Sequence, residues 1–256
     1  MKRRGGLKGR LLIGVAVAAF FLIKHYGSME TNPYTKKKQA ISMSTDEEVD
    51  MGYASIDRMV QHHGGLFPNE EYQAFVDNVG NKLVNSSIAK DSPYKYDFHL
   101  LADQNTINAF ALPGGPICIT YALFSKLENE DQLAGVLGHE IGHVLGRHSA
   151  ERIANSELWQ GLSTAGSVGA DMGGLVSQIG NGTLLKNGRG DELESDDLGV
   201  RFMINAGYDP EEMIGVMQIL KDAAGPNRVP EFQSSHPDPD NRVEHIRESI
   251  KKYDKS

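Results

Sequence analysis

Three residues near the middle of the chain have the types and the spacing that metal-dependent hydrolysis requires. His139, Glu140 and His143 form the pattern H-E-x-x-H inside the run from Asp131 to Ser149, D-Q-L-A-G-V-L-G-H-E-I-G-H-V-L-G-R-H-S. On a helix, positions four apart differ by roughly 40° about the axis, so both imidazoles can reach one metal ion, while Glu140 is displaced toward a water molecule on that ion. Zinc acidifies such a water to a pKa of about 7, and a carboxylate can then take its proton. The pattern predicts a zinc-dependent hydrolase.

The same run predicts the element that carries these residues. Its apolar positions recur every three or four residues, as on the buried face of an amphipathic helix: Leu133, Val136, Leu137, Ile141, Val144 and Leu145. One known arrangement of the third ligand continues the pattern as H-E-x-x-H-x-x-G-x-x-H. Gly146 fits it, but Ser149 stands where it requires histidine. His148 is one residue short, and we expect it at the surface or behind a ligand rather than on the metal.

A second acidic motif, R-G-D-E-L-E-S-D-D-L-G from Arg189 to Gly199, supplies a better third ligand. Glu192 and Asp196 are four residues apart on an expected helix, so they share a face. We predict that Glu192 completes the zinc site and that Asp196 accepts the outer N–H of a ligand histidine, which fixes the tautomer and direction of the ring. A solvated acidic helix face would explain this charge run on its own, but it does not explain why the run follows H-E-I-G-H.

Three motifs together identify a family. H-E-I-G-H-V-L-G-R-H-S, R-G-D-E-L-E-S-D-D-L-G and S-H-P-D-P-D-N-R-V from Ser235 occur in the order and style of the membrane-associated zinc metallopeptidases, the gluzincin family of the HtpX, BepA, Oma-type and CAAX prenyl proteases. N-P-Y-T-K-K-K-Q from Asn32 and N-A-F-A-L-P-G-G from Asn108 are similar to the periplasmic and Oma-like soluble-domain branch. The resemblance covers about residues 32 to 246. It implies an endopeptidase with one zinc ion (Zn2+) per chain that acts on damaged or misassembled membrane and envelope proteins.

The resemblance also implies further site residues. His236 and Arg242 lie where relatives place residues near the zinc. His236 would either donate to the oxyanion of the tetrahedral intermediate or close over the metal as a fourth ligand that holds the enzyme latent. The other interpretation is an exposed histidine before a proline. Asn108, Ala109 and Phe110 correspond to a strand above the cleft, where an extended substrate pairs by its backbone, unless they form an ordinary structural strand.

We expect these residues to be held by a mostly helical α+β domain of the zincin-like metalloprotease type, with H-E-x-x-H on its active-site helix. Caps and apolar spacing predict further helices at Thr45 to Val60, Asn69 to Leu83 and Asp209 to Leu220, and another that ends at Gly207. Three apolar runs around a Pro-Gly-Gly-Pro turn predict a small antiparallel sheet: Tyr96 to Leu100, Ile107 to Leu112 and Ile117 to Tyr121.

Other features carry weaker expectations. The segment between Gly161 and Gly190 is rich in glycine and lacks the G-K-[ST] ending of a phosphate loop, so we expect no nucleotide site. It suits a mobile cover over the cleft or a membrane-facing loop, and disorder explains it equally well. His62 and His63 are expected to be solvated. Cys118 is expected to be a small buried hydrophobic residue.

The N-terminus carries a targeting or anchoring signal. Five basic residues precede the apolar run from Leu11 to Ile23: Lys2, Arg3, Arg4, Lys8 and Arg10. As a helix the run is about 20 Å long, short of the roughly 30 Å hydrocarbon core, but a snorkelling Lys24 can extend it. We expect residues 1–26 to be an uncleaved signal anchor or, second, a cleaved signal peptide, then a linker at 27–44 and the peptidase domain at 45–256. The basic flank predicts an exported domain, membrane-anchored or periplasmic.

The charge and the motifs define the expected partners and function. A net charge of -8, with no basic patch beyond the first ten residues, argues against a nucleic-acid partner. The expected partners are misfolded or misassembled protein substrates and, through the N-terminal segment, a membrane. We predict a zinc metalloendopeptidase in protein quality control. The alternative is a latent or non-catalytic zinc-bound chaperone or scaffold, which Glu140 disfavours because structural zinc sites fill all four positions with protein ligands.

Overall fold

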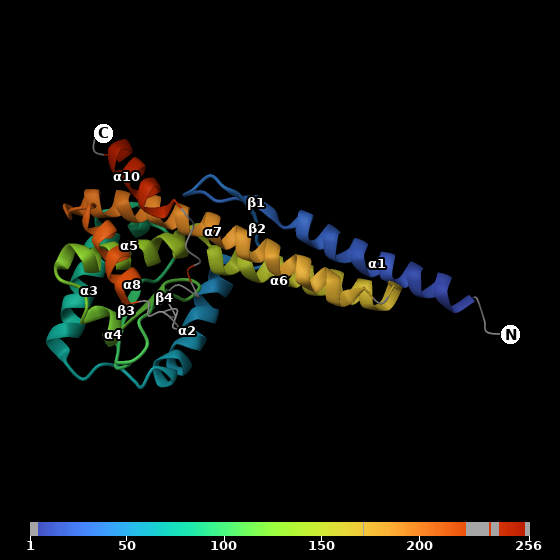
Figure 1. Cartoon of the computed structure of the whole chain (residues 1–256), viewed down its shortest axis with the longest axis horizontal. Helices are drawn as coiled ribbons and strands as arrows, with labels where there is room; N and C mark the ends of the chain where they lie inside the picture. Colours follow the sequence, from blue (N-terminus) through green and yellow to red (C-terminus); the bar gives the residue numbers. More distant parts are fainter. Residues whose placement is uncertain (1–4, 171, 224–235, 237–240, 254–256) are drawn as a thin grey trace. The chain divides into compact units, whose positions relative to one another are not determined.

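The computed structural model describes residues 5–170, 172–223, 236 and 241–253 (Figure 1). The chain divides into two compact units. We call Met1–Ser44 with Ser149–Gly188 the helical unit, and Thr45–His148 with Arg189–Ser256 the core unit. Helix α7 (Gly173–Ala206) begins in the first and ends in the second.

The core unit contains the helices that the sequence predicted and, among the described residues, three further ones. They are α2 (Thr45–His62), α3 (Glu70–Asn85), the 3-10 helix η1 (Ile88–Asp91), α4 (Tyr121–Phe124), α5 (Glu130–Gly146), the second half of α7, α8 (Glu212–Ala223) and α10 (Arg242–Tyr253). Asn69 caps α3 by accepting the N–H groups of Glu71 and Tyr72, and Asn129 caps α5 in the same way through Gln132. Gly207, with φ of 74°, ends α7 where the sequence predicted a stop.

The sheet of the core unit is mixed rather than antiparallel. Its strands β3 (Asp97–Leu101), β4 (Ala109–Ala111) and β5 (Pro116–Thr120) lie in the order β3-β5-β4. The β4–β5 hairpin is antiparallel, as predicted, but β3 pairs with β5 in parallel. The prediction of a wholly antiparallel sheet was wrong because β4 folds onto the far side of β5, so β3 meets the strand that runs in its own direction.

Helix α5 lies at the centre of the core unit. It packs against α3, α8 and strands β4 and β5. All six apolar positions predicted to face the core are buried, with exposures of 4% or less: Leu133, Val136, Leu137, Ile141, Val144 and Leu145. Phe202 and Met203 of α7 are fully buried as well. Because a close-packed interior allows little displacement, the side chains that project from the middle of α5 have fixed positions.

His63 and Cys118 of the core unit are both buried. His63 was expected to be solvated, but it is 4% exposed and its Nδ1 lies 3.0 Å from Asp103 Oδ2. That prediction was wrong because a carboxylate from a distant part of the chain satisfies the ring and Phe110 packs beside it. Cys118, in β5, is fully buried as expected.

The helical unit contains α1 (Gly5–Gly27), a hairpin of β1 (Met29–Thr31) and β2 (Lys38–Ala40), α6 (His148–Ala170) from Ser149 onward, and α7 as far as Gly188. The hairpin occupies the stretch expected to be a linker. The glycine-rich segment, expected to be a cover or a loop, is helical on both sides of residue 171. The expectation of a loop or of disorder was wrong because glycines and alanines of the segment lie where helices pack closely.

Candidate metal centre

The three predicted ligands meet. His139 and His143 project from the same side of α5, and their Nε2 atoms are 3.0 Å apart. Glu192, from α7, places Oε2 3.2 Å from His139 Nε2 and Oε1 3.4 Å from His143 Nε2. Its side chain is fully buried. A carboxylate about fifty residues downstream therefore faces the H-E-x-x-H pair, as the sequence predicted.

His236 adds a fourth donor to this group. Its Nδ1 lies 3.3 Å from His139 Nε2 and 3.1 Å from Glu192 Oε2. Its Nε2, on the other side of the ring, donates to the carbonyl oxygen of Ala109 at 3.3 Å. His236 is 5% exposed, so the interpretation of a solvent-exposed histidine was wrong. Ligand atoms of His139, His143, Glu192 and His236 all lie within 4.8 Å of one another.

This donor set fits a tetrahedral metal ion. Nitrogen and oxygen ligands about 2.0 to 2.1 Å from zinc are about 3.3 Å from each other in a tetrahedral site. The contacts among the four side chains, 3.0 to 3.4 Å, have that spacing. Three imidazoles and a carboxylate that point their lone pairs at one buried spot need a cation there to offset their repulsion and desolvation.

The electrostatics of the centre also favour a cation. Burial lowers the pKa of His139, but hydrogen bonds with Asp196 and Glu192 outweigh it and raise that pKa to about 9. Burial raises the pKa of Glu192, yet the nearby histidines, His143 first, bring it below its ordinary value. The surroundings of His139 thus stabilise a positive charge, and Glu192 stays negatively charged in the buried site. Both effects favour a cation at this place.

Asp196 lies behind His139. His139 Nδ1 donates to Asp196 Oδ1 at 2.8 Å. Arg242, from α10, holds the same carboxylate with two bonds, from Nε to Oδ2 at 2.7 Å and from Nη2 to Oδ1 at 2.9 Å. Asp196 and Arg242 are 1% and 4% exposed. This arrangement fixes the proton of His139 on Nδ1 and leaves Nε2 facing the other donors.

Glu140 is buried beside the donors without being one of them. It is fully buried, and Oε1 lies 3.5 Å from His236 Nε2. Neither carboxylate oxygen has a hydrogen-bond partner among the described residues. Burial raises its pKa above the ordinary value for glutamate. An unsatisfied buried carboxylate is costly, and in a hydrolytic site it is the group expected of a base that receives a proton.

His148 is buried and lies behind His143, which is one of the two places expected for it. Helix α5 ends at Gly146, and Arg147 takes a left-handed conformation with φ of 56°, so His148 folds back toward the helix. Its Nδ1 lies 2.9 Å from His143 Nδ1, and its Nε2 lies 2.8 Å from Glu194 Oε2. A Cβ on Gly146 would be 2.3 Å from the His148 ring. The glycine-arginine step between two histidines was the signal that could have revealed this contact.

Strand β4 lies at an edge of the sheet and contributes one contact to the site. Asn108 and Leu112 bond with β5 at Thr120 and Pro116. By strand alternation, the backbone groups of Ala109 and Ala111 point away from β5, toward the open edge. His236 already contacts the Ala109 carbonyl there. Of the predicted substrate contacts, Ala109 therefore presents its backbone outward, whereas Asn108 and Phe110 direct theirs to the sheet.

Comparison with known proteins places this site in a family. The model of Peptidase family M48 matches residues 70–250, which include all four donors. The chain belongs to peptidase family M48. M48 peptidases are metal-dependent, and the mostly helical, zincin-like fold expected from the sequence is confirmed.

Several relatives in this family share much of the chain. The beta-barrel assembly-enhancing protease of Yersinia pestis is 30% identical over 219 residues, 80% of this chain and 44% of the relative. The protein of that name from Escherichia coli (strain K12) is 29% identical over 229 residues, 84% and 46% of the two chains. The mitochondrial metalloendopeptidase OMA1 of Schizosaccharomyces pombe is 27% identical over 231 residues, 88% and 68%. The chain thus spans about half the length of the bacterial M48 relatives.

Proposed function

We propose that this M48 protein is a zinc-dependent metalloendopeptidase. One observation carries the proposal: His139, His143 and Glu192 converge within ligand distance of one another, and the unbonded carboxylate of Glu140 lies next to them. Nitrogen and carboxylate donors in this number are typical of zinc in hydrolases. The names of the relatives, which are proteases and endopeptidases, favour an enzyme over a scaffold.

The side chains divide the work of peptide hydrolysis. His139, His143 and Glu192 would hold zinc, whose Lewis acidity, when bound, activates water and polarises a peptide carbonyl. Glu140 accepts the proton of the attacking water and passes it to the leaving amine. Its raised pKa suits both steps, because a carboxylate of ordinary acidity is a weaker base. Asp196, held by Arg242, keeps His139 in the tautomer that can act as a ligand.

The roles of His236 and Arg242 follow from their contacts. Arg242 is engaged with Asp196, which supports a role in orienting His139 rather than in contacting the oxyanion. His236 supports a second state of the same enzyme. With Nδ1 among the donors and Nε2 on Ala109, it would fill the fourth position and occupy the strand edge, so the protein in this conformation would be latent. Movement of His236 would free the fourth ligand position and the carbonyl group of Ala109 at the same time.

The substrate class is proposed from the strand edge and the relatives. A substrate strand that pairs with Ala109 and Ala111 would be recognised through its backbone, so this edge suits extended protein segments of varied sequence. The relatives' names point to assembly of membrane β-barrels and to mitochondria. We therefore propose unfolded or misassembled membrane and envelope proteins as substrates. Of the described helices, α1 is long and apolar enough to cross a membrane, from Lys8 to Gly27, and we place the core unit on the non-cytoplasmic side.

Substitution of Glu140 tests the proposed function. We expect Glu140→Gln to keep bound zinc and to lose cleavage of an unfolded casein-type protein by about 10²- to 10⁴-fold, because the amide cannot accept the proton. Metal content by atomic spectroscopy and cleavage by gel assay measure the two effects. His139→Ala should lose both zinc and cleavage. Parental cleavage by Glu140→Gln would show that Glu140 is not the base, and a lack of peptidase activity in both the zinc-replete parent and a zinc-replete His236→Ala variant would refute the function itself.

A further inference from the structure

The helical unit exposes an unusually apolar surface. On α1, Leu12 and Ile23 are 70% and 73% exposed, and other large side chains of the helix are more than half exposed: Leu11, Ile13, Val15 and Phe20. Met172, which precedes α7, and Leu175 and Ile179 on α7 are about half exposed, at 49%, 51% and 53%. Large exposed apolar surfaces are rare in proteins surrounded by water, so this surface needs a partner.

The second and third helices of the unit carry almost no charge where they run beside α1. We call residues 158–185, the end of α6 and the start of α7, the α6–α7 hairpin. This stretch of 28 residues contains a single charged residue, Asp171, which lies outside the described residues. Each arm has about 13 residues and is therefore about 20 Å long. The hairpin is thus nearly free of charge over a length that fits within a hydrocarbon core.

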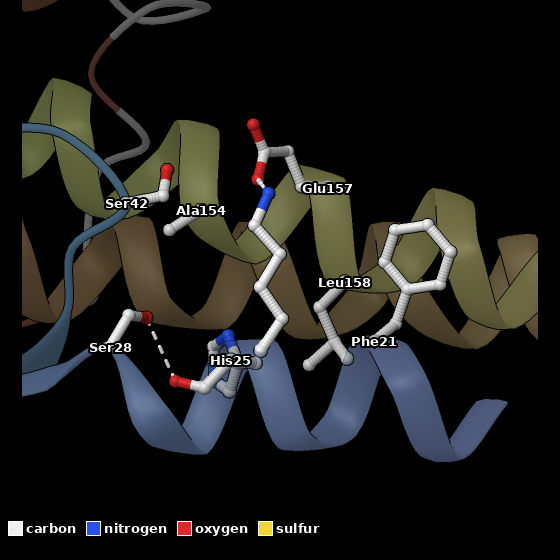
Figure 2. Close-up of a pocket in the computed structure, with 8 residues that line it drawn as sticks. Phe21, His25, Ser28, Ser42, Ala154, Glu157 and Leu158 are labelled. Carbon is white, nitrogen blue, oxygen red and sulfur yellow. Dashed lines mark hydrogen bonds and ion pairs between the residues drawn. The ribbon is translucent and has the colours of Figure 1, made fainter. Parts of the chain in front are cut away.

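The uncharged part of the hairpin lies beside the apolar run of α1, at the same level along the helix axis. At one end Lys24 Nζ pairs with Glu157 Oε2 at 2.6 Å, and Phe21 and His25 of α1 lie next to Leu158 and Ala154 of α6 (Figure 2). At the other end Arg10 Nε donates to the carbonyl of Val168 at 3.0 Å. The Lys24–Glu157 pair and Arg10 therefore mark the two ends of the stretch over which the apolar run of α1 lies beside α6. A slab of hydrocarbon that holds the apolar run of α1 would hold the hairpin too (Figure 1).

The packing between α1 and α6 is of the kind that membrane helices use. Gly161, Ala165 and Gly169 follow one another at four-residue spacing, and all three are buried. A Cβ on Gly161 would lie 2.1 Å from the Phe21 ring, and one on Gly14 would lie 2.8 Å from the Ala165 carbonyl oxygen. Small residues at this spacing let helix backbones approach where lipid supplies no hydrophobic driving force. This close approach also explains the abundance of glycine in the segment.

Four hydroxyl groups of the hairpin are hydrogen-bonded within it. Ser177 Oγ donates to Ser163 Oγ at 2.8 Å, and Ser163 Oγ donates to the carbonyl of Gly173 at 3.1 Å. The hydroxyls of Thr164 and Thr183 bond to the carbonyls four residues earlier, at 2.9 and 3.1 Å. Three side-chain amides lie in the half of the hairpin nearer Glu157: Gln160, Gln178 and Asn181. A lipid environment requires such internal bonding, whereas water does not.

We propose that the α6–α7 hairpin is embedded in the acyl-chain region of a lipid bilayer beside α1. The membrane unit of this protein is then a three-helix assembly rather than a single anchor, and α1 is retained as one of its helices. The partner is the bilayer, because the uncharged levels of the three helices coincide and large apolar side chains, such as Leu175 and Ile179, are exposed at those levels. The inference does not depend on peptidase activity.

Tryptophan fluorescence tests the proposal on the full chain. The chain has one tryptophan, Trp159, which lies near the Lys24–Glu157 end, whereas the Ser163–Ser177 bond places Leu175 near the middle of the apolar run. In phosphatidylcholine vesicles with brominated acyl chains, we expect Trp159 to be quenched most by bromines close to the headgroup. A Trp159→Phe, Leu175→Trp variant should be quenched most by bromines deep in the chains, and by more than half.

A matched variant provides the control. Leu66, in the core unit, is 53% exposed, close to the 51% of Leu175. Tryptophan in a Trp159→Phe, Leu66→Trp variant should not be quenched. We also expect Leu175→Lys to lower the inserted fraction of the hairpin by about 100-fold, with no such effect of Leu66→Lys.

The outcome that overturns the proposal is specific. If the protein floats with the vesicles while Leu175→Trp is quenched no more than Leu66→Trp, α1 is the anchor alone and the hairpin lies in water or against another protein. Failure of the parent protein to bind vesicles would overturn it as well. Quenching that weakens when the protein is diluted in lipid would assign the apolar surface to a second copy of the chain. Helical content by circular dichroism verifies that each variant is folded.

Discussion

Two consecutive imidazole contacts support the metal centre from behind. If His143 binds a metal through Nε2, its Nδ1 carries a proton and donates to His148 Nδ1 at 2.9 Å. His148 then carries its own proton on Nε2 and donates to Glu194 at 2.8 Å. Each ligand histidine of α5 thus has its own acceptor, since His139 uses Asp196. Partners of this kind set the tautomer and basicity of a ligand.

We expect His148→Ala to weaken zinc binding by about 10- to 100-fold, because His143 would lose the acceptor that orients it. Competition with a chelating dye measures the affinity. His148→Asn keeps an oxygen near the position of Nδ1 and should restore most of it. Substitution of the exposed neighbour of His63, His62→Ala, serves as the control. Equal affinity in His148→Ala and the parent, at equal helical content, would limit His148 to a packing role.

The sequence predicted those site residues that belong to a motif. His139, His143, Glu192 and Asp196 follow from spacing along helices, where geometry is regular. His148 does not, because the left-handed turn at Arg147 that redirects it depends on packing around Gly146. The burial of His63 depends on Asp103, forty residues away. Contacts that rest on irregular backbone or on distant partners have no periodic signature in the sequence.

At the scale of elements, strand β4 is where the fold would meet a substrate. Proline is tolerated in an edge strand when its missing N–H pointed outward. We expect Ala111→Pro to leave the sheet and the metal content intact and to raise KM for an extended peptide by about five- to tenfold, the loss of one backbone hydrogen bond. Ala111→Gly, which keeps the N–H, should retain the parental KM. An unchanged KM in the proline variant would exclude pairing at this position.

The elements themselves were predicted unevenly. Helices came from caps and apolar periodicity, both local properties of the chain, and their limits agree with the structure within a few residues. The order of the strands was not predicted. The parallel pairing of β3 with β5 joins distant parts of the chain, and the alternation of apolar and polar residues does not show which strands pair. Glycine led to a wrong expectation for the α6–α7 hairpin, since low helix propensity is outweighed where small residues permit close packing.

For the whole molecule, we expect metal to control stability. Zinc at about 100 times its dissociation constant stabilises the folded state by about 2.7 kcal/mol, which should raise Tm by roughly 5 to 10 °C. Differential scanning calorimetry with and without a chelator measures the shift. The His139→Ala, His143→Ala double variant should not respond. A parent whose Tm is indifferent to zinc would contradict the centre.

The same measurement should depend on pH with a definite sign. The pKa of His139 is raised to about 9 by Asp196 and Glu192 against the effect of burial, so in the metal-free protein its proton stabilises the fold fully below the ordinary value of 6.5. That contribution is lost as the pH rises through about 9. Because zinc must displace this proton, the gain in Tm from zinc should grow between about pH 5.5 and pH 8. A gain that shrinks over this range would show that His139 is not a ligand.

The residues of the metal centre come from widely separated parts of the chain: Asp196, His236 and Arg242 follow His139 by 57, 97 and 103 residues. Such long-range contacts form late, once most of the core unit has folded. A chain still being made or carried across a membrane would therefore hold the complete H-E-x-x-H motif without any ability to cut. Biosynthesis would be protected from self-digestion by geometry alone, with no need for a propeptide or an inhibitor.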